Sequence, residues 1–331
     1  MKKSSFVFIS IIVSVFSSLV LYTITKGFVS KKKLQNRDIN ISLKEVNSSK
    51  VDKKSFITKE EVTKLIVKPS KYILATEALD YEEAKKVSVE QNLSQLKNFK
   101  PLCKIEKSKY RVKTFDTSHP SVVIIMDDIS SQKEIDELKS LDLNITPSIF
   151  PCTKTHKDTP AIASKLKYYM VHTPMQAFNY AHPEIGTLKV SDSLDEIDKA
   201  ILAIHKDFPK LIAINNHTGS EFTSDLKAMD RLFCVLKKYK INFIDSKTAP
   251  HTLGKEMGKI YGMRVYNRDV FLDNIPDKNY ILDQLKKAVK KAKKSGLCIA
   301  ICHPRAKTFK ALKSAKRILG KVKLIYANEL Y

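Results

Sequence analysis

Two adjacent aspartates are the first residues in this sequence whose types and spacing could do chemistry. Asp127 and Asp128 directly follow the apolar run 122–126 (VVIIM). Two carboxylates held close together repel each other, and a bound cation relieves that repulsion. If imidazoles lie nearby as well, the combined ligands suit zinc or another divalent transition ion. The pair therefore favours a metal site over a purely structural role.

Later apolar runs also end in polar side chains. These side chains are His172, then Asn216, His217 and Ser220, then Asp245, and finally His303 and Arg305. In a barrel of parallel strands, the carboxyl ends of the strands meet at one rim, where active sites are built. A lone histidine there is more often a satisfied polar residue than a ligand, and Asp245 alone could be a helix N-cap. Five runs that each deliver a carboxylate or an imidazole are difficult to explain in a structural domain.

Together these residues supply the parts of a metal-dependent hydrolase. A metal held by Asp128 and His217, with His172 as the third ligand, would polarise a carbonyl and lower the pKa of a bound water. Asp127 would act as the general base, and His303 would protonate the leaving group. Asn216 and the backbone near Gly219, which follow the fourth apolar run, would stabilise the developing oxyanion. Such parts suit the hydrolysis of an amide or an ester.

The elements that must position these residues alternate regularly from Ser121 onward. Apolar runs of strand length occur at 122–126, 145–150, 168–172, 211–214, 241–244, 297–302 and 322–326. Helical patterns lie near 131–141, 158–167, 193–206, 224–240, 279–295 and 306–319. Near-continuous apolar strands that alternate with helices indicate a parallel sheet covered on both faces. We therefore predict an α/β fold, an irregular (β/α) barrel of about seven strands. A doubly wound open sheet is the alternative, although no nucleotide-binding glycine motif follows the first strand.

The residues before the barrel have a different character. Residues 6–24 carry no charge and approach the ~20 apolar residues that a membrane-spanning helix needs. No small-x-small cleavage site follows them. We predict a signal anchor over 1–26, a basic stalk over 27–118 with a helical segment at 73–96, and the barrel domain over 119–331. A single N-terminal anchor commonly exports the rest of its chain. We therefore expect a single-pass protein of the inner (cytoplasmic) membrane whose main domain is extracytoplasmic, in the periplasm.

The charge of the chain limits the classes of binding partner, and its cysteines limit the possible disulfides and zinc sites. The chain has 59 basic and 35 acidic residues, and its net charge of +24 favours polyanions such as anionic lipids or acidic glycans. The densest basic run, 286–294 (KKAVKKAKK), overlaps an apolar helical pattern, which is typical of a solvated helix face. We therefore expect no nucleic-acid partner. The five cysteines show no zinc-ligand spacing, and Cys298 and Cys302 lie too far apart on a strand to bridge each other.

Several motifs give the chain from about Ser121 to its end a family resemblance. They are IIMDDIS, VHTPM, GTLKVSDSLDEI, AINNHTGSEFTSD, FIDSKT, RDVFLDN and AICHPRAKT. In order and spacing they resemble the divergent polysaccharide deacetylases, a branch of the glycoside hydrolase/deacetylase (β/α)-barrel superfamily. The resemblance implies a carbohydrate substrate and N-deacetylation of a polysaccharide or peptidoglycan-type glycan. It also implies the same roles for Asp127, Asp128, His217 and His303. The residues expected to support or bind the substrate are Asn216, Ser220, Asp245, Asp273 and Arg305.

Two positions depart from the pattern of the classical deacetylases. In those enzymes a His-(Ser/Thr)-x-x-His motif supplies two ligands, whereas here Glu221 stands where the second histidine would be. Either His172 or Glu221 could complete the site. Gln176 stands where an acidic residue is expected after the Pro-Met pair. These departures keep open a catalytically weak or inactive module that binds envelope glycan. A third interpretation is a metal site that acts on a phosphoester or a peptide cross-link.

Overall fold

The structure is a computed structural model that describes residues 96, 99–104, 114–179 and 181–331. The predicted anchor, most of the predicted stalk and the helical segment at 73–96, apart from Leu96, lie outside the described residues. Within the described part of the chain, no helix is long and apolar enough to cross a membrane. The anchor and the stalk therefore remain predictions.

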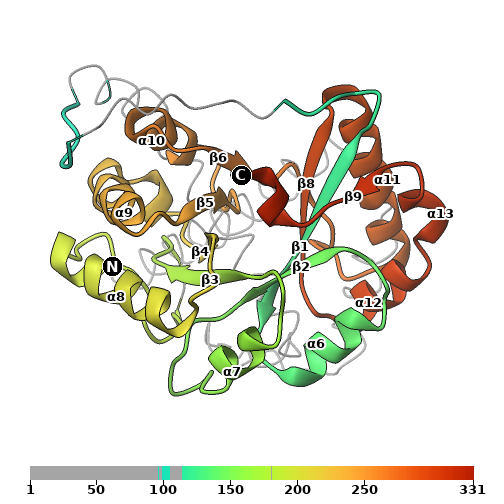
Figure 1. The fold of residues 1–331 in the computed structure, drawn as a ribbon, viewed down its shortest axis with the longest axis horizontal. Coiled ribbons are helices and arrows are strands. Elements are labelled where there is room, and N and C mark those ends of the chain that lie inside the picture. The colour runs from blue at the N-terminus through green and yellow to red at the C-terminus, as the bar shows by residue number, and fades with distance from the viewer. Residues whose placement is uncertain (1–95, 97–98, 105–113, 180) are drawn as a thin grey trace, which may run out of the picture. The chain divides into compact units, whose positions relative to one another are not determined.

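The described strands form one curled sheet in which every pair is parallel (Figure 1). The strands are β1 (Ser121–Ile129), β2 (Ile145–Ile149), β3 (Met170–Met175), β4 (Ala213–Thr218), β5 (Asn242–Asp245), β6 (Val265–Asn267), β7 (Val270–Phe271), β8 (Leu297–Cys302) and β9 (Lys323–Leu324). Their order is β6-β5-β4-β3-β2-β1-β8-β7, and β9 pairs with the beginning of β1. Only Arg268 and Asp269 join β6 to β7, so the chain itself links the two edges of the sheet. The fold is a curled parallel sheet of the (β/α)-barrel type.

Helices follow most of the strands and cover the outside of the sheet (Figure 1). They are α6 (Gln132–Lys139), α7 (Thr159–Ser164), α8 (Leu194–Asp207), α9 (Leu226–Tyr239), α10 (Gly254–Tyr261), α11 (Lys278–Ser295), α12 (Ala306–Lys313) and α13 (Lys316–Leu319), with short 3-10 turns η1 (Phe222–Ser224) and η2 (Ala327–Leu330). Ser131 and Ser193 begin α6 and α8 with capping boxes that Glu134 and Glu196 complete. In α11 most apolar side chains are buried, Leu282 is half-buried, and the lysines of 286–294 are exposed, which confirms the solvated-face prediction.

All seven predicted strands are present within a few residues of their predicted bounds. The predicted strand number was too low, because β6 and β7 also join the sheet. These two strands have only three and two residues, too few to produce a recognisable apolar run. Helix α10 was missed as well.

The side chains that point into the barrel change from apolar to polar along the strands. Because successive side chains of a strand alternate between its two faces, every second residue points inward. On β1 these residues are Val123 and Ile125, which belong to an interior apolar cluster together with Ile299 and Ile301 of β8. The cluster also contains Met170, Ala213 and Ile244 of β3, β4 and β5 and the C-terminal residues Ile325, Ala327 and Leu330. One further step along each strand brings Asp127 and His303 to the same interior face.

A disulfide ties the described segment 99–104 to the barrel. Cys103 bonds to Cys234 of α9, which lies 131 residues further along the chain. Next to it, the backbone N–H of Leu102 donates to the Asp230 carboxylate at 3.2 Å, and the Tyr261 hydroxyl also bonds to Asp230. Cysteine spacing could not reveal this pairing, because the two residues meet only after the chain has folded. The other three cysteines are free, so Cys298 and Cys302 do not pair, as predicted.

Candidate metal centre

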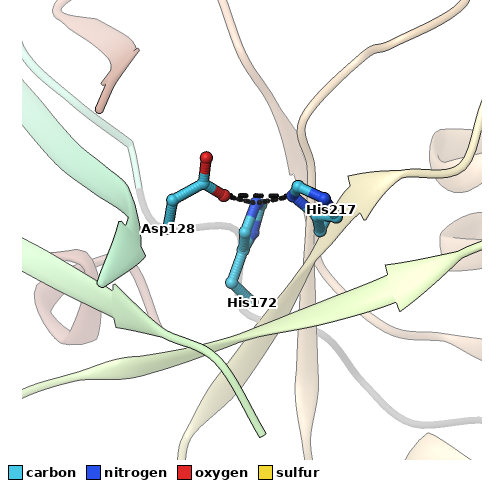
Figure 2. Close-up of side chains that lie close together, drawn as sticks. All are labelled: Asp128, His172 and His217. Carbon is cyan, nitrogen blue, oxygen red and sulfur yellow. Dashed lines mark hydrogen bonds and ion pairs between the residues drawn. The ribbon is translucent and has the colours of Figure 1, made fainter. Parts of the chain in front are cut away.

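Three potential metal ligands from three strands converge on one point at the carboxyl ends of the strands. Asp128 of β1, His172 of β3 and His217 of β4 point toward one another in Figure 2. Asp128 Oδ1 lies 3.0 Å from His217 Nδ1 and 3.3 Å from His172 Nε2, and the two imidazole nitrogens are 3.2 Å apart. The four-coordinate geometry of zinc, with bonds of about 2.0–2.1 Å, would place ligand atoms about 3.3–3.4 Å apart. The donor types and their spacing therefore fit a zinc-sized ion.

Backbone geometry explains how two consecutive aspartates both turn toward this region. Strand alternation alone would send Asp127 and Asp128 to opposite faces. Asp128, however, has a left-handed backbone with φ of +59°, and the pairing of β1 with β2 shifts register between Met126 and Ile129. This irregularity rotates the Asp128 carboxylate to the rim above the inward-facing Asp127. Thr218, the last residue of β4, and Lys247, two residues after β5, also have positive φ values of +51° and +53°. Strained backbone of this kind is typical of functional sites.

Asn215 is the centre of a buried hydrogen-bond network behind the three ligands. Its Nδ2 lies 2.9 and 3.0 Å from the two carboxylate oxygens of Asp127, and 3.0 Å from Ser246 Oγ. Its Oδ1 accepts from Ser148 Oγ at 2.6 Å and lies 3.1 Å from His172 Nδ1. These contacts connect Asp127, which is 2% exposed, to the ring of His172.

Asn216 was predicted to support the site, whereas its neighbour Asn215 was missed. The structure bonds Asn216 to the backbone, because its Oδ1 accepts from the Ser246 N–H at 2.9 Å and its Nδ2 donates to Thr218 O at 2.7 Å. It is not among the residues that converge with Asp128. The alternation of side chains along a strand could have identified Asn215, since it stands two positions before His217 and therefore shares its face of β4.

His303 approaches the same point from β8, on the other side of β1 in the sheet. Its Nε2 lies 3.8 Å from Asp128 Oδ2, and its Nδ1 lies 3.0 Å from Asp273 Oδ1. The other Asp273 oxygen accepts from the His303 N–H at 2.8 Å and from the Thr308 hydroxyl at 2.7 Å. Arg305 donates to the Asp273 carbonyl at 2.9 Å. Asp273 therefore holds the His303 ring with Nε2 directed toward Asp128.

The pKa values of the two adjacent aspartates are shifted in opposite directions. Burial raises the pKa of Asp127, against the opposing effect of His172. Burial also favours a higher pKa for Asp128, but His217 and His303 hold the pKa of that carboxyl well below its ordinary value. For His303, burial opposes protonation, yet Asp273 and Asp128 outweigh it and raise the pKa to about 9. Asp128 is thus an ionised ligand candidate, and His303 is a protonated group beside it.

The remaining residues predicted to support the site lie around it. Ser220 Oγ accepts from the Phe178 N–H at 3.1 Å. Asp245 is fully buried, and its Oδ1 accepts from the Lys247 N–H at 2.8 Å. It does not cap a helix, since α10 begins after Leu253. Both residues shape the loops at the rim.

Gln176 and Glu221, the two residues that depart from the classical pattern, are hydrogen-bonded to each other. Gln176 Nε2 donates to Glu221 Oε2 at 2.8 Å, and Gln176 Oε1 accepts from the Val190 N–H at 2.9 Å. Of the two candidates for the third ligand, His172 lies in the cluster with Asp128, whereas the Glu221 carboxylate is paired with Gln176.

An aromatic side chain that was not predicted to belong to the site closes one side of the cluster. The ring of Phe150 lies 5.0 Å from that of His217 and 5.7 Å from that of His172, and it stacks on His156 at 4.6 Å. Phe150 follows β2, whose end carries no charged residue that would have drawn attention to it. An apolar wall of this kind limits the access of water and strengthens electrostatic interactions inside the site.

Comparison with known proteins agrees with this geometry. Residues 124–331 match the family described as divergent polysaccharide deacetylases. The chain belongs to this family. The match begins on β1, just before the two aspartates, and runs to the last residue, so it covers every residue of the candidate metal centre.

Three further proteins are similar to this deacetylase-family chain. The uncharacterized protein YibQ of Escherichia coli is 34% identical over 143 residues, which are 43% of this chain and 45% of that protein. An uncharacterized protein of Haemophilus influenzae is 28% identical over 208 residues, 62% of this chain and 74% of that protein. A solved structure from Agrobacterium tumefaciens, also uncharacterized, shares the fold with a TM-score of 0.57 at 17% identity, over 73% of this chain and 94% of that one. This chain thus spans less than half of the length of YibQ.

Proposed function

We propose that the protein is a metal-dependent hydrolase that removes N-acetyl groups from an envelope polysaccharide or a peptidoglycan-type glycan. The observation that carries the proposal is the convergence of Asp128 Oδ1, His172 Nε2 and His217 Nδ1 within 3.0–3.3 Å of one another. These residues would hold a divalent ion, with zinc as the best fit to a ligand set of two imidazoles and one carboxylate. When bound, the ion would polarise the acetyl carbonyl and lower the pKa of the attacking water.

His303 supplies the proton that the leaving group needs. In the net reaction, the water oxygen bonds to the acetyl carbon and the C–N bond breaks. Asp127 would accept one proton of the attacking water as the general base, acetate leaves, and after the proton transfers both protons of the water end on the amine nitrogen. His303 is protonated at neutral pH because its pKa is raised to about 9, and its Nε2 lies 3.8 Å from Asp128 Oδ2. It can therefore donate to the departing nitrogen, while Asp273 fixes the ring through Nδ1.

We also propose that the domain works outside the cytoplasm, at the surface of the inner membrane. The Cys103–Cys234 disulfide supports this location, because such bonds form and persist in oxidising compartments. The uncharged stretch at 6–24 supports an anchor that would place the enzyme close to its glycan. The net charge of +24 would attract the acidic groups of the envelope.

Zinc binding by the full-length chain, purified in detergent, tests the metal centre. We expect one-to-one binding in a calorimetric titration, and its loss in His172→Ala and His217→Ala. His119→Ala is the matched control, since His119 is exposed and its ring nitrogen pairs with Asp116. A well-folded parent that binds no divalent ion would overturn the proposed metal centre.

Acetate release tests the reaction. We expect the zinc-loaded chain to release acetate from N-acetylglucosamine oligomers or peptidoglycan, and Asp128→Asn to release none. A glycan that binds the zinc-loaded chain without losing acetate would instead support the inactive glycan-binding module. The presence of Glu221 at the position of the classical second histidine favours that second candidate.

A further inference from the structure

Asp127 and the metal ligands lie on opposite sides of the His172 ring. The Asp127 carboxylate is on the Nδ1 side, where its Oδ2 is 3.7 Å from His172 Nδ1. Asp128 and His217 are on the Nε2 side. Asp127 is 2% exposed, and both of its oxygens accept from Asn215 Nδ2. The Asn215 amide therefore connects this carboxylate to the His172 ring.

The contacts of Asn215 determine the orientation of its amide group. Its NH2 group lies beside both Asp127 oxygens and donates to them. The carbonyl oxygen of Asn215 then faces Ser148 and His172. In the reverse orientation that oxygen would lie about 3 Å from two carboxylate oxygens without any proton between them.

The amide orientation in turn selects the tautomer of His172. Because Asn215 Oδ1 can only accept, the His172 nitrogen 3.1 Å away from it must carry the proton. His172 Nδ1 is therefore protonated, and Nε2 presents its lone pair to Asp128 and His217. This is the form of imidazole that binds a metal ion through Nε2, and a partner on the other nitrogen commonly sets it.

We infer that Asp127 is a positioning residue for the metal centre, which acts through Asn215 and His172. Asp127 holds the Asn215 amide, the amide fixes the tautomer of His172, and the tautomer makes Nε2 available to the ion. The inference rests on the proposed metal centre. The two adjacent carboxylates then lie on opposite sides of the His172 ring. Asp128 binds the ion, and Asp127 orients the His172 ligand.

Replacing Asp127 by asparagine tests the inference, with zinc affinity as the readout. The Asp127→Asn side chain would place an NH2 against the NH2 of Asn215. Rotation of the Asn215 amide relieves that contact but then directs an N–H at His172 Nδ1, so the proton moves to Nε2. We expect zinc to bind about 10–100-fold more weakly, as for other changes behind metal-bound histidines. Asp230→Asn is the matched control, because Asp230 is also a buried carboxylate, but it bonds to the Leu102 N–H and the Tyr261 hydroxyl. Its zinc affinity should match that of the parent.

A spectroscopic readout reports the tautomer directly. In metal-free protein labelled with nitrogen-15, the His172 ring shifts should indicate a proton on Nδ1 in the parent and on Nε2 in Asp127→Asn. If the asparagine variant does not fold, Asp127→Ser removes the charge but keeps a hydroxyl oxygen that can accept from Asn215 Nδ2, and we expect a smaller loss of zinc affinity.

The outcomes separate the inference from the proposed function. A parent that binds no zinc refutes the metal centre itself. A parent and an Asp127→Asn variant with equal zinc affinities and the same His172 tautomer overturn the inference. Loss of acetate release at an unchanged zinc affinity would show that Asp127 acts as the general base alone.

Discussion

His303 Nε2 lies 3.8 Å from Asp128 Oδ2, although the two residues are 175 positions apart in the chain. Adjacent parallel pairing of β1 and β8 creates this proximity, with Met126 opposite Cys302 in register. The protonated imidazole and the ionised carboxylate stabilise each other's charged forms. The pair and its neighbours therefore affect properties that can be measured.

The stability of the metal-free protein should fall as the pH rises through the titration of His303. Its ordinary pKa of 6.5 is raised to about 9 by folding. The folded state therefore binds the proton more tightly, and this stabilisation is complete below pH 6.5 and lost as the pH approaches 9. Urea denaturation in the presence of a chelator, at several pH values across this window, measures the change. His303→Gln should flatten the profile, and an equally steep profile in that variant would contradict the assignment.

Removing the charge of Asp273 should destabilise the protein strongly. Asp273 is fully buried and holds the ring of His303, its backbone N–H and the hydroxyl of Thr308. Loss of one partner leaves a buried charge uncompensated, at a cost of about 3–5 kcal/mol. We expect Asp273→Asn to lower the free energy of unfolding by this amount and to reduce acetate release. Asp283→Asn, whose exposed carboxylate pairs with Lys286, should change stability little.

The Cys103–Cys234 disulfide should contribute a substantial part of the stability. Its loop spans 131 residues, and the loss of a native disulfide typically costs about 2–5 kcal/mol. The double variant Cys103→Ser/Cys234→Ser should unfold at a lower urea concentration, whereas Cys152→Ser, at an exposed free thiol, should not. Thiol titration checks the pairing independently. One thiol should react quickly in the native protein, three after denaturation, and all five after reduction.

Adding a methyl group at Gly219 should disturb the loop that comes after His217. Gly219 has φ of +91°, and a Cβ there would lie 2.9 Å from the Met175 Cβ. Gly186 has a similar φ of +83° with open space around it, so it separates backbone strain from crowding. We expect Gly186→Ala to cost about 1–2 kcal/mol. Gly219→Ala should cost about 1–3 kcal/mol more and weaken zinc binding. Equal destabilisation in the two variants would show that the contact with Met175 is not limiting.

The positions of the strands and of most candidate ligands could be predicted from the sequence. Buried parallel strands produce continuous apolar runs, and polar residues that end such runs lie at one rim whatever the exact register. Asp128, His172 and His217 were found in this way. The short strands β6 and β7 were not, because a run of two or three residues carries no periodicity.

The sequence by itself thus determined the alternation of strands and helices and the rim at which the reactive residues lie. Only the tertiary structure decided which side of each strand those residues take and which distant residues touch. The left-handed backbone of Asp128 decided that two consecutive aspartates serve one site from different sides of His172. The inward face of β4 made Asn215, rather than Asn216, the partner of His172. Chain folding brought Cys103 to Cys234. Each of these depends on backbone torsions and long-range register, which are settled by packing of the whole barrel and leave no local pattern.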